Sequence, residues 1–121
     1  MAPMADIAGG AQGCCPHFHA AVELIGRRWT GAIIYVLLQG GAMRFGEIAT
    51  AVPALSDRLL SQRLKDLEAQ GIVERTTVGG PASRTRYALT PMGRSLAPAV
   101  GELETWGRRW LDTPDITFRP V

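Results

Sequence analysis

The fold is decided by residues 44–89, which read RFGEIATAVPALSDRLLSQRLKDLEAQGIVERTTVGGPASRTRYAL. A short amphipathic helix opens this stretch and ends at Pro53, and a longer helix occupies Ser56 to Gly71. Two segments rich in β-branched residues follow, Ile72 to Val78 and Arg84 to Leu89, on either side of a Gly-Gly-Pro turn. Helix, turn, helix and β-hairpin in this order predict a mostly α-helical fold of the winged helix-turn-helix class.

The limits and the buried face of the second helix follow from its own residues. Ser56 is a good N-cap, because its hydroxyl can accept a backbone N–H that the first turn leaves unpaired. Gly71 supplies the left-handed conformation that commonly ends a helix. Between these limits we expect one apolar stripe to pack inward, formed by Leu60, Leu64 and Leu67.

The opposite face of this helix combines two cations with two hydrogen-bonding side chains: Arg58, Ser61, Gln62 and Lys65. Such a face is most often a solvated helix surface. In a helix-turn-helix, however, the N-terminal part of the second helix enters the major groove of DNA. There Arg58 suits guanine and Gln62 suits adenine, whereas Lys65 suits a phosphate. Arg63 lies toward the flank, where we expect it to pair with an acid.

The hairpin is interpreted as the wing of the motif. Arg84 and Arg86 alternate with Thr85 and Tyr87, and therefore point to one side of their strand. Near the tip, Arg84 suits a phosphate or minor-groove contact; the alternative is an exposed hairpin whose charged edge discourages aggregation. The full set of expected DNA contacts is Arg44, Ser56, Arg58, Ser61, Gln62, Lys65, Arg84 and Arg86.

The composition limits the other classes of function. The formal net charge of 121 residues is only +2, so affinity for DNA must come from local clusters of cations. The longest apolar run, Ala32 to Leu38, is too short for a bilayer and no signal peptide is recognised; we therefore expect a cytoplasmic protein without membrane contact. Neither a phosphate-binding loop followed by lysine nor a nucleophile elbow is found, so we expect neither an enzyme nor a cofactor.

The remaining segments are interpreted as tails and scaffold helices. Residues 1–13 are rich in Gly and Ala and are expected to be disordered, residues 14–111 to form one domain, and residues 112–121 to be a C-terminal tail. A first helix is expected from Pro16 to Gly26, and a second, more buried one from Trp29 to Gly40-Gly41.

A last helix is expected from Thr90-Pro91 to Trp110, kinked at Pro98 because proline lacks the N–H that would bond to Arg94. Its two tryptophans lie on one stripe. They either pack in the core against the first helix or anchor a subunit interface. We predict a homodimer whose interface contains Phe18, Val22, Leu103, Trp106 and Trp110.

Several short motifs are shared with a known family. They are Leu24-Ile25-Gly26 with Trp29, Arg44-Phe45, Leu55-Ser56, Leu60-Ser61-Gln62-Arg63-Leu64, Leu67-Glu68, Gly71-Ile72-Val73, and Tyr87-Ala88-Leu89-Thr90 with Gly93. As a set, over residues 15–110, they resemble the HxlR-type family of bacterial winged helix-turn-helix regulators. The resemblance implies a dimeric transcription factor, expected to be a repressor, that binds inverted-repeat operators in double-stranded DNA. It also implies that the first and last helices make the contacts between the two subunits.

The segment Cys14-Cys15-Pro16-His17-Phe18-His19 admits three interpretations. Cys15 would cap the first helix, whose positive end favours a reactive thiolate. Several members of the HxlR-type family sense quinones, aldehydes or oxidants through a cysteine just before this helix, which implies sensing by Cys15 with Cys14 as a helper. The alternatives are two reduced thiols without function, or a metal site made by Cys14, Cys15, His17 and His19, although these lack the usual C-x-x-C spacing.

Two further alternatives concern how the protein is regulated and to which functional class it belongs. The effector could be a small apolar ligand held between the subunits, near Trp106, in place of cysteine chemistry. A winged helix used only for protein contacts would need no cationic groove face, whereas Arg58, Lys65 and Arg84 supply one. The sequence therefore favours the DNA-binding regulator over the interaction module.

Overall fold

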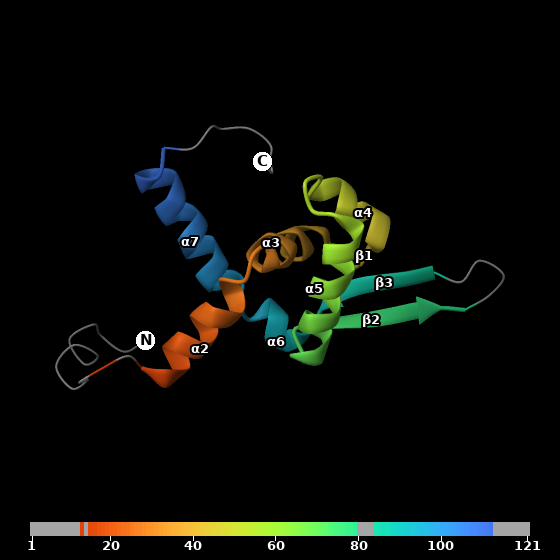
Figure 1. Cartoon of the computed structure of the whole chain (residues 1–121), viewed down its shortest axis with the longest axis horizontal. Coiled ribbons are helices and arrows are strands. Elements are labelled where there is room, and N and C mark those ends of the chain that lie inside the picture. The colour runs from red at the N-terminus through yellow and green to blue at the C-terminus, as the bar shows by residue number, and fades with distance from the viewer. Residues whose placement is uncertain (1–12, 14, 80–83, 113–121) are drawn as a thin grey trace.

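The computed structural model describes residues 13, 15–79 and 84–112 (Figure 1). In chain order the elements are α2 (Pro16–Ile25), α3 (Thr30–Gly40), β1 (Met43–Arg44), α4 (Phe45–Ala51), α5 (Asp57–Ala69), β2 (Val73–Val78), β3 (Arg84–Leu89), α6 (Pro91–Arg94) and α7 (Ala97–Trp110). The mostly helical winged helix-turn-helix is confirmed, with α4 and α5 as the motif helices and β2–β3 as the hairpin. The expectations for residues 1–12, Cys14, the tip at 80–83 and residues 113–121 fall outside the described residues.

The limits of α5 agree with the signals in its sequence. The Ser56 hydroxyl oxygen accepts the backbone N–H of Leu59 at 3.1 Å, as an N-cap should. Gly71 follows the helix with a φ of +80°, in the left-handed region that favours glycine. The start of α5 and its separation from β2 are therefore determined by local residues, Ser56 and Gly71, and not by tertiary contacts.

The core lies where α3, α4 and α5 meet the hairpin. Each element contributes apolar side chains, and the stripe expected on α5 is buried as predicted. The buried members, at or beside these elements, are Ile33, Ile34, Leu37, Ile48, Val52, Leu55, Leu60, Leu64, Leu67, Ile72, Val73 and Leu89. Burial of this continuous set, at about 2 kcal/mol per large aliphatic side chain, supplies the main favourable term of folding.

The sheet has one more strand than the sequence predicted. Its order is β1-β3-β2, antiparallel throughout. β1 pairs Met43 with Tyr87 and Arg44 with Arg86. A strand of two residues is too short to show alternation, and only its pairing with β3 reveals it.

The single long helix expected from Thr90 to Trp110 is wrong, because two helices occupy this region. Thr90 caps α6 as predicted, accepting the N–H of Gly93 at 3.1 Å. The chain then leaves the helix at Ser95 and Leu96, and α7 begins at Ala97. Pro98 thus stands in the first turn of a new helix, where its missing N–H costs no hydrogen bond, and does not kink an existing one.

The helices α2 and α7 project at the end of the molecule opposite the hairpin (Figure 1). Neither contains a buried residue. Trp106 is 54% exposed and Trp110 is 64% exposed, so the alternative in which they pack in the core of one chain is wrong. Among the described residues, no helix combines the length and the apolar character needed to cross a membrane.

The start of α6 depends on a close backbone approach. Gly93 is buried, and a Cβ atom at this position would overlap the carbonyl oxygen of Ile72. That oxygen also accepts the N–H of Thr90 at 2.9 Å, so it has little freedom to move away.

We predict that Gly93→Ala lowers the free energy of unfolding by about 1–3 kcal/mol, because the added methyl group overpacks this contact. Urea unfolding followed by circular dichroism measures the change. Gly101→Ala is the matched control, since a Cβ there meets no atom within 4 Å, and it should raise helix stability by about 0.5–1 kcal/mol. Equal effects of the two substitutions would contradict the role given to Gly93.

Candidate functional site

The outward face of α5 is the first part of the candidate site. Arg58, Gln62 and Lys65 are exposed and Ser61 is half-buried, on the side of the helix opposite the buried leucines. The structure therefore brings together the four residues that the sequence assigned to one face. They extend from the first turn toward the middle of the second motif helix, the part of such a helix that enters a DNA groove.

The described residues offer no acidic partner to the two cations of this face. Within the described part of the chain, no carboxylate forms an ion pair with Arg58 or Lys65. Both positive charges are therefore available to a polyanion without the cost of breaking an existing pair. Ser56 is exposed at the start of the helix, and because its oxygen accepts the N–H of Leu59, its own O–H stays available as a donor.

Gln62 is held by an acid that the sequence analysis did not consider. Its Nε2 donates to Oδ1 of Asp66 at 3.1 Å. A carboxylate only accepts hydrogen bonds, so this contact fixes which end of the Gln62 amide faces Asp66 and leaves the amide oxygen directed elsewhere. The i, i+4 spacing of the two residues in α5 is the signal that would have indicated the contact.

Asp66 also joins α5 to the segment between α2 and α3. Its Oδ2 lies 3.2 Å from the guanidinium of Arg27 and 3.4 Å from that of Arg63. Arg63 in addition donates to the carbonyl oxygen of Arg28 at 3.0 Å. The expectation that Arg63 pairs with an acid is confirmed, and the outward face of α5 is linked through Asp66 to the end of α2.

The arginines of the hairpin form a second basic surface. Arg44 lies directly opposite Arg86 in the pairing of β1 with β3, and Arg84 is on the same face two residues along the strand. The paired and buried Val73 and Leu89 mark the core-facing side of the sheet, so by alternation the arginines face away from the core. Like charges placed opposite one another in a sheet are unfavourable unless an anion lies between them.

The two basic surfaces belong to different elements of the structure. The first lies on α5, whereas the second lies on β1 and β3. Arg84 is exposed and Arg86 is half-buried. An occupant that used both surfaces would have to be long and negatively charged.

The cysteine segment lies at the projecting end of the molecule. Cys15 is exposed and is the N-cap of α2, with Pro16 at the first helical position, as predicted. Cys14 lies outside the described residues, and His17 and His19 are exposed on α2. Among the residues that the structure describes, no three His, Cys, Asp or Glu side chains gather closely enough to hold a metal ion.

Comparison with known proteins identifies relatives of this arrangement. The chain is 44% identical over 98 residues to YvaP of Bacillus subtilis (strain 168), an uncharacterized HTH-type transcriptional regulator, which covers 81% of this chain and 90% of that protein. It superposes on the reduced form of the transcriptional regulator YodB from B. subtilis with a TM-score of 0.74 at 36% identity, covering 85% of this chain and 100% of that one. YodB has also been solved diamide-treated and quinone-bound.

A second solved relative is the redox regulator HypR in its reduced form. It superposes with a TM-score of 0.74 at 32% identity and covers 79% of this chain and 94% of that one. The family model for the HxlR-like helix-turn-helix matches residues 24–115, a range that contains the α5 face and the hairpin arginines. The chain therefore belongs to the HxlR-like helix-turn-helix family of DNA-binding transcriptional regulators.

Proposed function

We propose that this chain controls transcription by binding an inverted-repeat operator as a homodimer, with one α5 helix in the major groove of each half-site. The observation that carries the proposal is the exposed α5 face, where Arg58 and Lys65, which form no ion pair with another described residue, flank the hydrogen-bonding Gln62. Its place of action is then the cytoplasm, where bacterial DNA lies. The DNA-binding unit is taken as residues 14–111.

Each residue of the site has a role in this proposal. Arg58 and Gln62 read base edges, because a guanidinium matches guanine and a carboxamide matches adenine in the major groove. The remaining members position the protein on the sugar-phosphate backbone. These are Arg44, Ser56, Ser61, Lys65, Arg84 and Arg86.

The proposed dimer interface uses the apolar surface at the projecting end. Phe18 and Val22 of α2, with Leu103, Trp106 and Trp110 of α7, are all large, apolar and between 48% and 65% exposed. Tryptophan is enriched at the centre of protein interfaces. Two-fold symmetry then predicts half-sites centred about one helical turn of DNA apart, about 34 Å, or a multiple of this distance.

Cys15 is the proposed sensor of oxidants or electrophiles. It is exposed at the positive end of α2, next to the proposed interface. The diamide-treated and quinone-bound forms of the relative YodB support such a role. Modification of Cys15 would alter how two copies meet, and so the relative orientation of the two α5 helices.

Selection from random duplex DNA tests the central proposal. The purified chain is incubated with the random pool under reducing conditions and again after mild oxidation. We expect an enriched inverted repeat in the reduced arm and its loss in the oxidised arm. No enriched sequence in either arm would reject sequence-specific regulation and favour a protein-interaction module.

We predict that Arg58→Ala lowers affinity for the selected operator by about 1–3 kcal/mol, or roughly 5- to 150-fold, and relaxes the base preference at one position of each half-site. Fluorescence anisotropy with labelled operator measures the affinity. Arg75→Ala removes the same charge from β2, where Arg75 pairs with Glu68 on the other face of the hairpin from Arg84 and Arg86, and should change affinity little. A wild-type affinity for Arg58→Ala would contradict the assignment.

For Arg84→Ala we expect the behaviour of a lost phosphate contact, in contrast to the lost base contact of Arg58→Ala. Binding to all sequences should weaken alike, and the slope of log affinity against log salt should fall by about one unit for each lost phosphate contact. The contrast between the two substitutions separates base reading from backbone positioning.

We predict that Trp106→Ala weakens the homodimer at least about 30-fold, because it removes a buried aromatic anchor from the interface. Sedimentation equilibrium at micromolar concentration measures the change. Met92→Ala is the control, since Met92 is similarly exposed at 57% but lies on α6. If the wild-type chain stays monomeric, the proposed dimer interface is rejected.

We predict that diamide treatment modifies Cys15 and that Cys15→Ser abolishes the loss of operator binding. Two thiols form a disulfide, and their two electrons and two protons pass to diamide. Mass spectrometry of the digested protein identifies the cysteine that is joined to Cys15, which is either Cys14 or the Cys15 of a second copy of the chain. Absence of both a disulfide and an adduct at Cys15 would reject sensing.

A further inference from the structure

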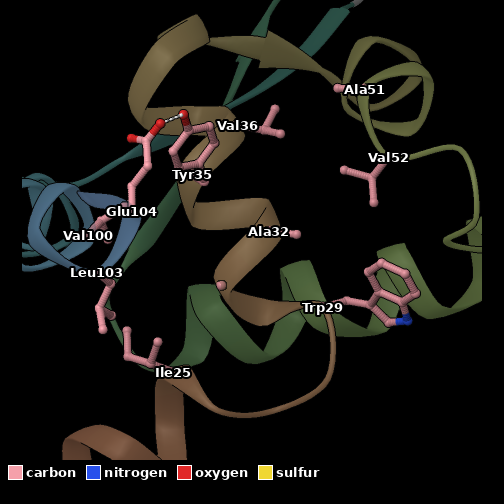
Figure 2. A pocket seen from close by; sticks show the side chains of 11 residues that line it. Ile25, Trp29, Ala32, Tyr35, Val36, Ala51, Val52, Val100, Leu103 and Glu104 are labelled. Carbon is pink, nitrogen blue, oxygen red and sulfur yellow. Dashed lines mark hydrogen bonds between the residues drawn. The ribbon is translucent and has the colours of Figure 1, made fainter. Parts of the chain in front are cut away.

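A cavity of about 560 Å³ lies over one side of α3, between α4 and α7. Figure 2 shows Trp29 on one side of it, and Leu103 and Glu104 on the other. Among the described residues that line it, Glu104 is the only charged one, and its carboxylate already accepts a hydrogen bond from Arg108 at 2.7 Å. The carboxylate that contacts the outward face of α5 is a different one, Asp66.

Asp66 lies one helical turn after Gln62, and its two carboxylate oxygens have different partners. Oδ1 accepts a hydrogen bond from Nε2 of Gln62 at 3.1 Å. Oδ2 lies 3.2 Å from the guanidinium of Arg27 and 3.4 Å from that of Arg63. Arg63 is itself held by the carbonyl oxygen of Arg28 at 3.0 Å. Because both oxygens have partners, the carboxylate has a defined orientation and Oδ1 is kept toward Gln62.

This contact reduces the hydrogen bonds that Gln62 can offer to another molecule. A glutamine amide has one carbonyl oxygen and two N–H groups, and its two ends interchange readily when nothing restrains them. One N–H of Gln62 is used by Asp66, so one acceptor and one donor remain. Turning the amide over would place its oxygen against Oδ1, where two acceptors meet and no hydrogen bond forms.

The remaining pair of groups matches one purine and not the other. In the major groove, adenine presents the acceptor N7 beside the donor N6–H, whereas guanine presents N7 and O6, both of them acceptors. An unrestrained glutamine can turn its –NH₂ group toward guanine. In the orientation that Asp66 imposes, the oxygen of Gln62 would instead meet O6 of guanine, and two acceptors would again face each other.

We propose that Asp66 is a positioning residue that determines specificity: by using one N–H of Gln62, it makes adenine preferred over guanine at the base that Gln62 reads. The inference rests on the proposed function, in which Gln62 contacts a base edge. Asp66 acts through Gln62 and needs no contact with DNA of its own.

The charge of Asp66 has the opposite effect on general affinity. A carboxylate beside the groove is repelled by the phosphates, and this one also pairs with two cations that would otherwise attract them. Removing the charge is therefore expected to strengthen binding to all sequences while the preference for adenine falls. Loss of a contact that only stabilised the fold would weaken all binding and leave the base preference unchanged.

The experiment compares operator duplexes that carry adenine or guanine at the position whose preference is lost in Gln62→Ala. In Asp66→Asn the introduced amide can either accept from Gln62 or donate to it, so both orientations become available. We expect the preference for adenine over guanine to fall at least about fivefold, with binding to unrelated DNA unchanged or stronger. Fluorescence anisotropy measures both, and a wild-type preference in Asp66→Asn would overturn the proposal.

Glu68→Gln is the matched control, since it makes the same change of charge on α5 at a residue that pairs with Arg75. It should alter general affinity but keep the preference for adenine. In the Gln62→Ala background, Asp66→Asn should have no effect on base preference. An effect there would mean that Asp66 acts by another route, and would overturn the proposal.

Modified operators give a test with the wild-type chain, which holds even if Asp66→Asn proves unstable. At the same position, 7-deazaadenine lacks the N7 acceptor and unsubstituted purine lacks the N6 amino group. Each should weaken binding about fivefold, the effect of one lost hydrogen bond, and neither should do so in Gln62→Ala. If loss of the amino group has no effect, the oxygen of Gln62 does not face the base and the proposal is wrong.

The contact itself is measured without DNA. In NMR spectra of the full chain, the side-chain amide signals of Gln62 should shift in Asp66→Asn and stay in place in Glu68→Gln. Unshifted signals in Asp66→Asn would overturn the proposal whatever the chain binds. If the wild-type chain selects no operator, the proposed function is rejected and this inference with it; if it selects one with no preference for adenine at this position, only the inference fails.

Discussion

Burial of the leucine stripe of α5 is the constraint on which the candidate site depends. Leu60, Leu64 and Leu67 are almost fully buried, each contributing about 2 kcal/mol of hydrophobic free energy. Rotating the helix by a single residue position would expose them, so packing alone fixes its orientation. The face that carries Arg58 and Lys65 is outward because the opposite face must be inward. The orientation of the candidate site is thus fixed by residues that are not part of it.

The hydrogen bonds and ion pairs around Asp66 orient side chains more than they stabilise the fold. In the ion pair between Arg27 and Asp66, the two side chains are 58% and 30% exposed, and a pair of this kind contributes at most about 1 kcal/mol. What it does provide is a defined orientation for the Gln62 amide, because a carboxylate accepts only the N–H end. The same carboxylate links α5 to the end of α2, so the outward face of α5 and the helix that begins after Cys15 share one set of contacts.

The end of the molecule formed by α2 and α7 exposes apolar side chains, in contrast to the polar outward face of α5. There α2 and α7 leave large apolar side chains in solvent, and the cavity over α3 is walled by both α7 and the end of α4. An exposed apolar surface of this kind is expected to be covered by a partner. The cavity and the exposed stripe share Leu103, so both depend on the position of α7.

The sequence by itself determined those features that depend on local chemistry. The Ser56 cap, the Gly71 end, the leucine stripe and the β-branched arms of the hairpin all specify structure within a few residues, and α5, β2 and β3 were predicted accordingly. Only the tertiary structure decided the rest: the strand β1, the separation of α6 from α7, the exposure of Trp106 and Trp110, and the pairing of Arg44 with Arg86. These depend on which distant segments meet. The cavity is the extreme case, since its lining extends from Ile25 to Glu104 and no local pattern brings these residues together.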